Sequence, residues 1–434
     1  MTVSALAVVA VLFLLLVNGM PVGFALLVAG GVGLLAVGGP PTALGVLRSS
    51  PYEHAASFAL STIPMFILMA EFLTAGRVTR ELFVACHRWM GHVRGGLSSA
   101  SVTAGVLLAA ISGSSSASAA TLASAAYPEM KRYDYDDAFA TGVVAVVGTL
   151  ALMIPPSIGL VLYGVFTETS VGKLLLAGII PGLLTAVGYV VTILVTTWLR
   201  PEAAPRSTVT YSLEEKLTAL VPIWPMVALM VGVIGAIYAG IVTPTEAGAV
   251  GALAALLIGL FKRRLTWGSF HTALENAVRN SAMIFMIIIG AVVFSVFLTL
   301  TGTVQDLITA IDESGMNRWF VFAAFILMYL VLGFFLDQLA ILILTLPLTF
   351  PILTGLQFDP VWLGIVLVKT AEIGLVSPPL GLNVFIVSNV TKVPVWIVFR
   401  GVMPFLITDF AVLAIIVAFP PLVLLIPEIS GALG

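Results

Sequence analysis

The sequence predicts an all-helical polytopic membrane protein with an inverted-topology repeat, and three observations lead to this fold class. Sixty per cent of the 434 residues are hydrophobic and only 9% are charged, with a mean hydropathy of +1.15. Prolines recur at one long spacing, and lysine and arginine gather in one set of connections. At roughly 20 apolar residues per crossing, such a chain spans a bilayer many times and has no room for a large soluble domain.

The repeat is carried by helix-breaking residues that lie 223 positions apart. With 24 prolines in the chain, about 0.6 Pro–Pro coincidences are expected by chance at one spacing, whereas five are present. They are Pro21 with Pro244, Pro128 with Pro351, Pro155–Pro156 with Pro378–Pro379, and Pro181 with Pro404. We therefore expect a first copy over 1–200, a linker over 201–216 and a second copy over 217–434.

The orientation of the two copies follows from the basic residues. Five connections hold 15 of the 19 lysines and arginines, and the positive-inside rule places such connections in the cytoplasm. They are the connections near 77–96, 128–136, 200–216, 262–280 and 391–400. The copies then face opposite ways across the membrane, and both termini are predicted to be periplasmic.

Each copy is predicted to contain the same elements in the same order. The first has scaffold helices within 1–75, an arm helix at 77–95, a re-entrant hairpin at 97–127, a broken helix at 137–165 and a helix at 172–199. The second has scaffold helices within 217–301, an arm at 303–318, a re-entrant hairpin at 319–354, a broken helix at 360–390 and a last helix at 396–427.

The arm at 77–95 is predicted from its periodicity. Apolar residues recur there at three- and four-residue steps, opposite Arg80 and Arg88. This pattern is typical of a helix that lies in the membrane interface. The alternative is an ordinary loop helix that packs on protein.

The hairpins are predicted because 97–127 and 319–354 are each too long for one helix and break near the middle. Non-helical backbone at membrane depth is tolerated only where it is buried in protein or lines a wet cavity. Duplicated membrane bundles with paired helix breaks are typical of secondary transporters, in which the breaks form the binding site. Transport is therefore the leading functional hypothesis.

The first hairpin tip is rich in hydroxyl groups. It consists of Ser112, Gly113, Ser114, Ser115 and Ser116. Hydroxyls and free carbonyls supply the several oxygen ligands that a hard cation such as Na⁺ requires, without a fixed charge. The alternative is that these small residues only allow close helix packing.

Two double prolines, Pro155–Pro156 and Pro378–Pro379, break the helices that follow the hairpins. Each pair removes two amide donors, so the carbonyls one turn earlier are free to face an ion. The half-helix beyond each break offers a positive dipole end to an anionic substrate. A bare kink is the alternative, but recurrence in both copies favours a site. The residues next to these breaks include Gly148, Thr149, Glu372, Gly374 and Ser377.

Charged residues within apolar segments are further candidates, since a charge that faces lipid costs several kcal/mol. Lys369 and Glu372 lie three residues apart on one helical face, so they could neutralise each other. The alternative is that Lys369 contacts the substrate. Glu71, Glu246, Asp337 and Asp409 are the other charges of this kind.

Enzymatic functions fit poorly, and no enzyme is expected. The sequence has no H-E-x-x-H motif and no phosphate-binding G-x-x-x-x-G-K-[ST] loop. An intramembrane serine protease would need a histidine at membrane depth, whereas all four histidines fall in connections or arms. The single cysteine, Cys86, excludes a disulfide within the chain, and no basic tail indicates a nucleic-acid partner.

Eight motifs carry a family resemblance. They are SGSSSASAATLASAAYPEMKR (112–132), IPPSIGLVLYG (154–164), LLAGIIPG (175–182), GIVTPTEAGA (240–249), GFFLDQLA (333–340), FDPVWLGI (358–365), EIGLVSPPLGLNVF (372–385) and FRGVMPF (399–405). With these motifs, the chain resembles over essentially its whole length the large membrane (permease) subunit of tripartite ATP-independent periplasmic (TRAP) transporters.

The resemblance implies an elevator-type secondary transporter of the bacterial inner membrane, with a scaffold and a mobile region that carries both hairpins. It also implies sodium symport of an organic acid, such as a C4-dicarboxylate or another carboxylate, with Na⁺ as coupling ion and no other cofactor. A periplasmic substrate-binding protein and a small four-helix membrane subunit would be the partners. A self-sufficient ion-coupled anion transporter is the alternative, and a non-transporting membrane scaffold is a remote one.

The resemblance further implies a sodium site at each hairpin tip, where the tip meets a broken helix. The first site would use Ser112, Ser114, Ser115, Gly148, Thr149 and Pro155, with Gly113, Ser116 and Pro156 beside them. The second would use Gly333, Asp337, Glu372, Gly374, Ser377, Gly381 and Asn383, with Pro378 and Pro379 beside them. The tips differ in chemistry, because Ser114 of the first corresponds to Asp337 of the second.

Overall fold

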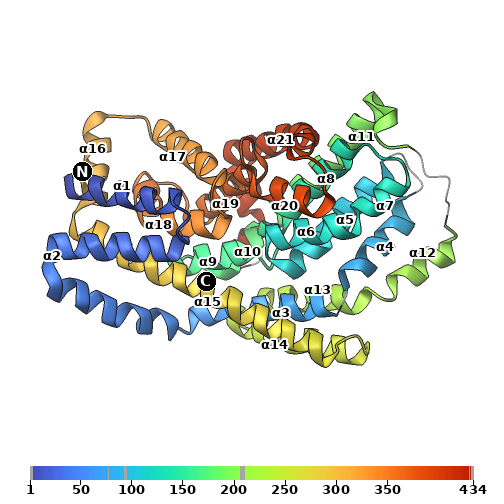
Figure 1. Cartoon of the computed structure of the whole chain (residues 1–434), viewed down its shortest axis with the longest axis horizontal. Helices are drawn as coiled ribbons and strands as arrows, with labels where there is room; N and C mark the ends of the chain where they lie inside the picture. Colours follow the sequence, from blue (N-terminus) through green and yellow to red (C-terminus); the bar gives the residue numbers. More distant parts are fainter. Residues whose placement is uncertain (1–2, 77, 92–94, 206–210, 430, 432–434) are drawn as a thin grey trace.

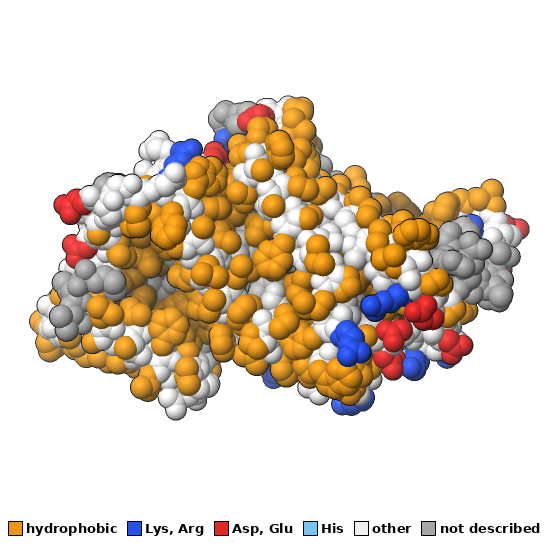
Figure 2. All heavy atoms as spheres, turned by 90° about the horizontal axis from the view of Figure 1, so that it is seen from above, with side chains coloured by type: hydrophobic (Ala, Val, Ile, Leu, Met, Phe, Trp, Pro, Cys, Tyr) orange, Lys and Arg blue, Asp and Glu red, His pale blue; other side chains and the backbone are white. Residues whose placement is uncertain are grey.

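The computed structural model describes residues 3–76, 78–91, 95–205, 211–429 and 431, and every regular element in these ranges is a helix (Figure 1). Six of the described helices are long and apolar enough to cross a membrane, or up to seven if the bent pair α12–α13 counts as one span. Much of the face in Figure 2 is hydrophobic, with charged side chains gathered towards its ends. The predicted all-helical, multi-pass membrane class is confirmed.

Most helices of the segments predicted as scaffold lie along the lower side of Figure 1, below the hairpins and broken helices, whereas the first helix lies higher, at the left. The name scaffold is used below for the helices of the two segments predicted as such, together with α12 before the second segment: α1 (Val3–Val17), α2 (Val22–Ala55), the 3₁₀ helix η1 (Ala59–Ser61), α3 (Thr62–Ala75), α12 (Leu213–Leu220), α13 (Trp224–Tyr238), α14 (Pro244–Phe261) and α15 (Trp267–Leu300). Its long helices α2 and α15 lie against each other, as do α3 and α14.

In the stretches predicted as hairpins and broken helices, the structure has paired helices with a short break between them, and these names are kept for them below. The first hairpin is α5 (Gly96–Ser112) with α6 (Ser115–Ala125), and the second is α17 (Arg318–Gly333) with α18 (Gln338–Gly355). The first broken helix is α8 (Asp137–Thr149), η2 (Leu150–Leu152) and α9 (Ile158–Phe166), and the second is α19 (Pro360–Val376) with α20 (Leu382–Thr391). The remaining elements are α4 (Val78–Met90), α7 (Tyr127–Arg132), α10 (Val171–Ala177), α11 (Ile179–Leu199), η3 (Pro201–Ala203), α16 (Thr303–Ser314), α21 (Val395–Ala418) and α22 (Pro420–Ile429).

The arm helix α4 packs on protein along its apolar side. Leu82, Ala85 and Cys86 are buried, and α4 contacts α5 and α12. Its Glu81 forms ion pairs with Lys262 at 3.0 Å and with Arg264 at 2.5 Å. Of the predicted arm at 77–95, residues 77 and 92–94 and the side chain of Arg80 lie outside the described part of the chain.

Three predicted boundaries are wrong. The basic stretch 262–280 is a connection only as far as Thr266, whose side chain accepts a hydrogen bond from the Ser269 amide and starts α15 at Trp267. The linker over 201–216 ends early in the same way, because Ser212 and Glu215 form a capping box that starts α12. The last helix is two helices, since Pro420 forces Phe419 out of helical geometry (φ −126°, ψ 69°).

Glycines allow the helices to approach closely at the contacts that position the breaks. A Cβ at Gly30 of α2 would lie 2.7 Å from the backbone nitrogen of Phe294 in α15. Between α8 and α21, a Cβ at Gly142 would overlap the backbone of Gly401, and one at Gly401 would overlap the carbonyl of Ala138. Small residues at helix contacts are the usual device in membranes, where close van der Waals packing replaces hydrophobic collapse.

We expect Gly401→Ala to destabilise the protein by about 1–3 kcal/mol, because the new methyl group pushes α21 away from α8. The thermal midpoint of the purified protein in detergent measures this effect. Gly235→Ala in α13 is the matched control, since nothing lies within 4 Å of its Cβ position. Equal midpoints for the two variants would show that α8 and α21 separate without cost.

Candidate functional site

The first hairpin tip is a tight reversal between two helices. Gly113 ends α5 with a left-handed backbone (φ 55°), and Ser114 is extended. The Ser112 hydroxyl donates to the Ser114 carbonyl at 3.0 Å, and the Ser114 hydroxyl accepts from the Ala117 amide at 3.4 Å. Glycine is required here because other residues pay a steric cost at positive φ. The serines therefore build the tip and at the same time bring hydroxyl oxygens to it.

The second tip uses a carboxylate for the same purpose. Asp337 is extended, and its Oδ1 accepts from the amides of Leu339 at 2.8 Å and Ala340 at 3.2 Å. Ser114 and Asp337, which are equivalent in the 223-residue register, are thus both the N-caps of the returning helices. Gln338 is buried, and neither of its amide atoms has a partner among the described residues.

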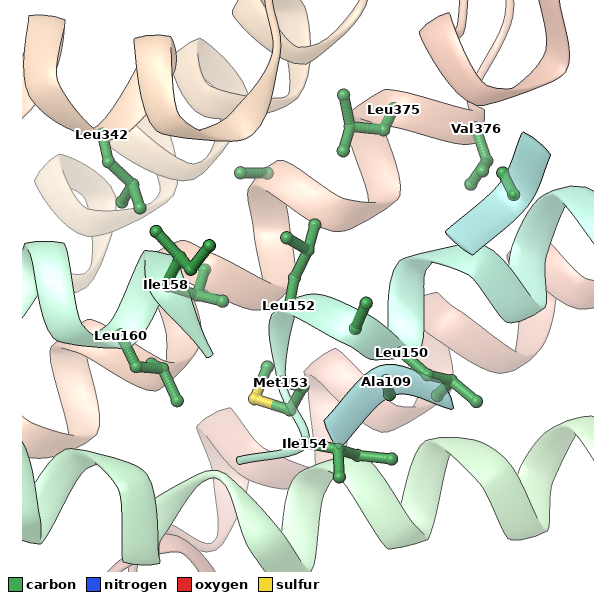
Figure 3. Packing of buried hydrophobic residues seen from close by; sticks show 14 of the residues in the cluster. Ala109, Leu150, Leu152, Met153, Ile154, Ile158, Leu160, Leu342, Leu375 and Val376 are labelled. Atoms are coloured by element: carbon green, nitrogen blue, oxygen red, sulfur yellow. The ribbon is translucent and has the colours of Figure 1, made fainter. Parts of the chain in front are cut away.

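Thr149 and Ser157 stabilise the first break through hydrogen bonds to the backbone, one residue on each side of the two prolines. The Thr149 hydroxyl donates to the Val146 carbonyl at 2.8 Å, and Ser157 donates to the Leu152 carbonyl and caps α9. Pro155 and Pro156 line a small cavity beside α13. In Figure 3, Leu152 and Met153 lie among buried hydrophobic residues of neighbouring helices, so the irregular backbone is enclosed by protein.

The second break ends α19 at Val376. Ser377 is extended, and its hydroxyl donates to the Ile373 carbonyl at 2.7 Å. Pro378 and Pro379 are exposed, and Gly381 (φ 53°) precedes α20. The peptide bond between the two prolines is cis, as it is at the first break.

Each hairpin meets the broken helices at close range. Asn383 of α20 donates through Nδ2 to the Ser115 hydroxyl at 2.5 Å and to the Ala145 carbonyl at 3.4 Å. A Cβ at Gly148 of α8 would lie 2.7 Å from Ala119 of α6, and one at Gly333 would lie 2.6 Å from Gly374. The structure therefore brings Gly333 against Gly374 of the predicted second site, whereas Ser115 of the predicted first site contacts Asn383 of the predicted second one, and Gly148 contacts α6 beyond the tip.

A cavity of about 440 Å³ lies between the two tips and the scaffold. Of the predicted site residues, the first tip from Ser112 to Ser116 and Asp337 line it. The other predicted residues lie outside this lining. They are Gly148, Thr149, Pro155, Pro156, Gly333, Lys369, Glu372, Gly374, Ser377, Pro378, Pro379, Gly381 and Asn383.

The scaffold supplies an opposite wall that sequence reasoning missed. Glu71 of α3 accepts from Asn276 at 3.2 Å and from Asn280 at 3.4 Å, and all three line the cavity. Glu71 was identifiable as an intramembrane charge. The two asparagines, one helical turn apart, were hidden because the stretch around them was expected to be a connection.

Unpartnered buried oxygens test whether the site fits a cation. Among the described residues, six buried side-chain oxygens have no hydrogen-bond partner, and three of them belong to predicted site residues or their neighbours: Asn383 Oδ1, Gln338 Oε1 and Glu372 Oε1. Buried acceptors of this kind normally have a donor, water or ion. Oxygen ligands without thiolate or imidazole suit a hard cation such as Na⁺, and of these three residues Gln338 lies in the cavity lining.

Comparison with known proteins decides the family. The model described as "Tripartite ATP-independent periplasmic transporter, DctM component" matches residues 9–422. The chain belongs to this family. It is therefore the large permease component of a TRAP transporter, and not an enzyme.

Named relatives of this permease cover nearly its whole length. The C4-dicarboxylate TRAP transporter large permease protein DctM of Pseudomonas aeruginosa is 37% identical over 90% of this chain and 91% of its own. The protein of the same name in Rhodobacter capsulatus is 33% identical over 99% and 100%. The sialic acid TRAP transporter large permease protein SiaM of Vibrio cholerae is 31% identical over 97% of each chain. The family resemblance read from the motifs is confirmed.

Lys369 of the permease is fully buried and paired. Its ammonium lies 3.2 Å from Glu372 Oε2 and 2.7 Å from Asp409 Oδ1. The pairing of Lys369 with Glu372, one of the two alternatives from the sequence, is present. Asp409 was noticed in the sequence only as an intramembrane charge, because its partner lies 40 residues away on another helix.

We expect Asp337→Ala to lower the thermal midpoint of the permease, because loss of an N-cap costs about 0.5–2 kcal/mol. Asp337→Asn should keep the midpoint, since an asparagine oxygen also caps a helix. The two variants separate the role of Asp337 as a helix cap from the role of its charge. The thermal midpoint and substrate uptake are both measured. An equal loss of stability in both variants would show that the carboxylate charge itself holds the tip.

Proposed function

We propose that this permease imports an organic acid, such as a C4-dicarboxylate or another carboxylate, by sodium symport and an elevator-type movement of its hairpin region. The observation that carries the proposal is the cavity between both hairpin tips and the scaffold. One wall of the cavity belongs to the predicted mobile region and the other to the scaffold. A substrate held at the tips would therefore move past Glu71, Asn276 and Asn280.

Charge in the cavity supports coupling to a cation. The lining contains the carboxylates of Glu71 and Asp337, and no lysine or arginine among the described residues. An organic acid in this cavity needs positive charge from elsewhere. The N-terminal ends of α6 and α18 supply part of it, and Na⁺ at the two tips would supply the rest.

The movement requires a rigid scaffold and connected arms. Close packing of α2 on α15 supports a rigid scaffold, and α4 and α16 connect it to the two hairpins along the chain. In this proposal the copies are an inverted repeat in the bacterial inner membrane, with both termini periplasmic. The bias of lysine and arginine supports that orientation.

The partners follow from the tripartite family. We infer a periplasmic binding protein that delivers the substrate and a small four-helix membrane subunit. The named relatives act on C4-dicarboxylates and sialic acid, and both substrate types carry carboxylate groups. The carboxylate group is the shared chemistry that the proposal assigns to this chain.

We expect uptake into proteoliposomes only when the binding protein, the small subunit and an inward sodium gradient are all present. The substrate is first identified as the organic acid that raises the thermal midpoint of the binding protein. Radiolabelled uptake is then measured with each component left out in turn. Uptake without the binding protein would establish the self-sufficient alternative instead.

We expect Ser115→Ala and Thr149→Ala to raise the sodium concentration for half-maximal uptake. Loss of one oxygen ligand costs roughly 1–3 kcal/mol, which corresponds to about 5–150-fold. Thr272→Ala is the matched control for Thr149→Ala, because its hydroxyl also donates to a helix carbonyl, at Gly268, but is exposed and outside the cavity. Unchanged sodium curves for both site variants would show that the small residues of the first tip serve only close helix packing.

A further inference from the structure

Four polar side chains form a cluster in the middle of the protein, outside the cavity. They are Lys369 and Glu372 of α19, Asp409 of α21 and Tyr189 of α11, with exposed fractions of 0%, 1%, 1% and 0%. The cluster joins residues from both copies of the repeat. Among the lysines that the structure describes, Lys369 is the one that is completely buried. A buried charge is costly unless it is paired.

Lys369 lies at different distances from the two carboxylates of the cluster. The Lys369 ammonium is 2.7 Å from Asp409 but 3.2 Å from Glu372. The Tyr189 hydroxyl lies 2.9 and 3.0 Å from the two Asp409 oxygens, to which it donates. Asp409 is therefore fully engaged, whereas Glu372 is bonded only through Oε2.

The cluster holds more acidic groups than basic ones. One ammonium faces two carboxylates, and Glu372 Oε1 is buried without a partner among the described residues. The helices packed on α19 are α8, α9, α10, α17, α18, α20, α21 and α22. Among their described residues, only Asp409 forms an ion pair with Lys369. A pair that served stability alone would need one acid, not two.

The unpaired oxygen belongs to a residue beside the second break. Glu372 lies two residues before Gly374, which touches Gly333 of the second tip. On the other side of the cluster, the Tyr189 hydroxyl is 3.5 Å from Thr149 at the first break. The cluster thus shares Glu372 with the second candidate ion site and reaches the first through Tyr189 and Thr149.

We propose that Lys369 is a resident cation that competes with Na⁺ for Glu372, and that Asp409 sets the sodium affinity by holding the ammonium away. When Lys369 is drawn to Asp409, the Glu372 carboxylate is available to a cation at the second break. When it is drawn to Glu372, that carboxylate is neutralised. The inference rests on the proposed sodium coupling and adds two residues that determine its strength.

The test uses the complete transporter, with its binding protein and small subunit, in proteoliposomes. The readouts are the sodium concentration for half-maximal uptake and the sodium concentration that half-maximally raises the thermal midpoint of the purified permease, each measured in Asp409→Asn, Lys369→Met and the double variant. Asp409→Asn leaves Lys369 with Glu372 alone, so each concentration should rise about tenfold or more. Lys369→Met should lower it, and the double variant should return to within about threefold of the wild type, because Glu372 is again free of competition.

If the ion pairs of Lys369 only stabilise the fold, the variants give a different result. In that case the single variants lose stability, and the sodium curve of the surviving protein stays unchanged, which overturns the proposal. If Asp409→Asn does not fold, Lys369→Arg replaces it, because a guanidinium fork spans both carboxylates and should also raise the sodium requirement. An Arg variant with an unchanged curve also overturns the proposal.

The control is an ion pair of equal length at the surface, Lys131 with Asp137 at 2.7 Å. Lys131→Met with Asp137→Asn should leave the sodium curve unchanged. Wild-type uptake without any sodium dependence would refute the proposed function itself. A sodium-dependent wild type with an unshifted Asp409→Asn curve refutes only the competition at Glu372.

Discussion

Four helix breaks meet inside an apolar protein, and the unpaired backbone groups at these breaks must be satisfied there. Lipid offers no hydrogen bonds, so every free amide or carbonyl needs a partner from protein, water or an ion. The structure uses one short polar side chain at each returning helix: Ser114, Ser157 and Asp337 cap amides, and Ser377 bonds a carbonyl. The hydroxyls of Ser112 and Ser157 also donate to carbonyls at the breaks, so short polar side chains satisfy both kinds of backbone group there.

Close packing around the breaks follows from the same constraint. The tips reach the broken helices only because Gly148, Gly333 and Gly374 carry no Cβ. Each contact encloses irregular backbone that would otherwise face lipid. The glycines and the caps therefore act together, since a tip that could not approach its broken helix would leave its oxygens exposed to hydrocarbon.

The sequence predicted the breaks well because prolines, glycines and serines impose local geometry that does not depend on distant residues. Pro155–Pro156, Gly113 and Asp337 each change the backbone where they stand. Boundaries set by side-chain caps were less visible, as Thr266 and Ser212 show. Contacts between distant segments were not predictable from one sequence. Asn280 with Glu71 and Tyr189 with Asp409 depend on how helices pack, which periodicity does not encode.

Charge is the quantity that links the cavity to the buried cluster. Both hold more carboxylates than basic groups: Glu71 with Asp337 in the cavity, and Glu372 with Asp409 around a single lysine. A protein that carries an anion through such a region must bring cations with it, because an uncompensated negative charge in a low-dielectric interior is strongly unfavourable. In the function proposed above, this excess of acid over base ties movement of the substrate to binding of the ion, because a loaded state without its coupling cation would hold uncompensated negative charge in the protein interior.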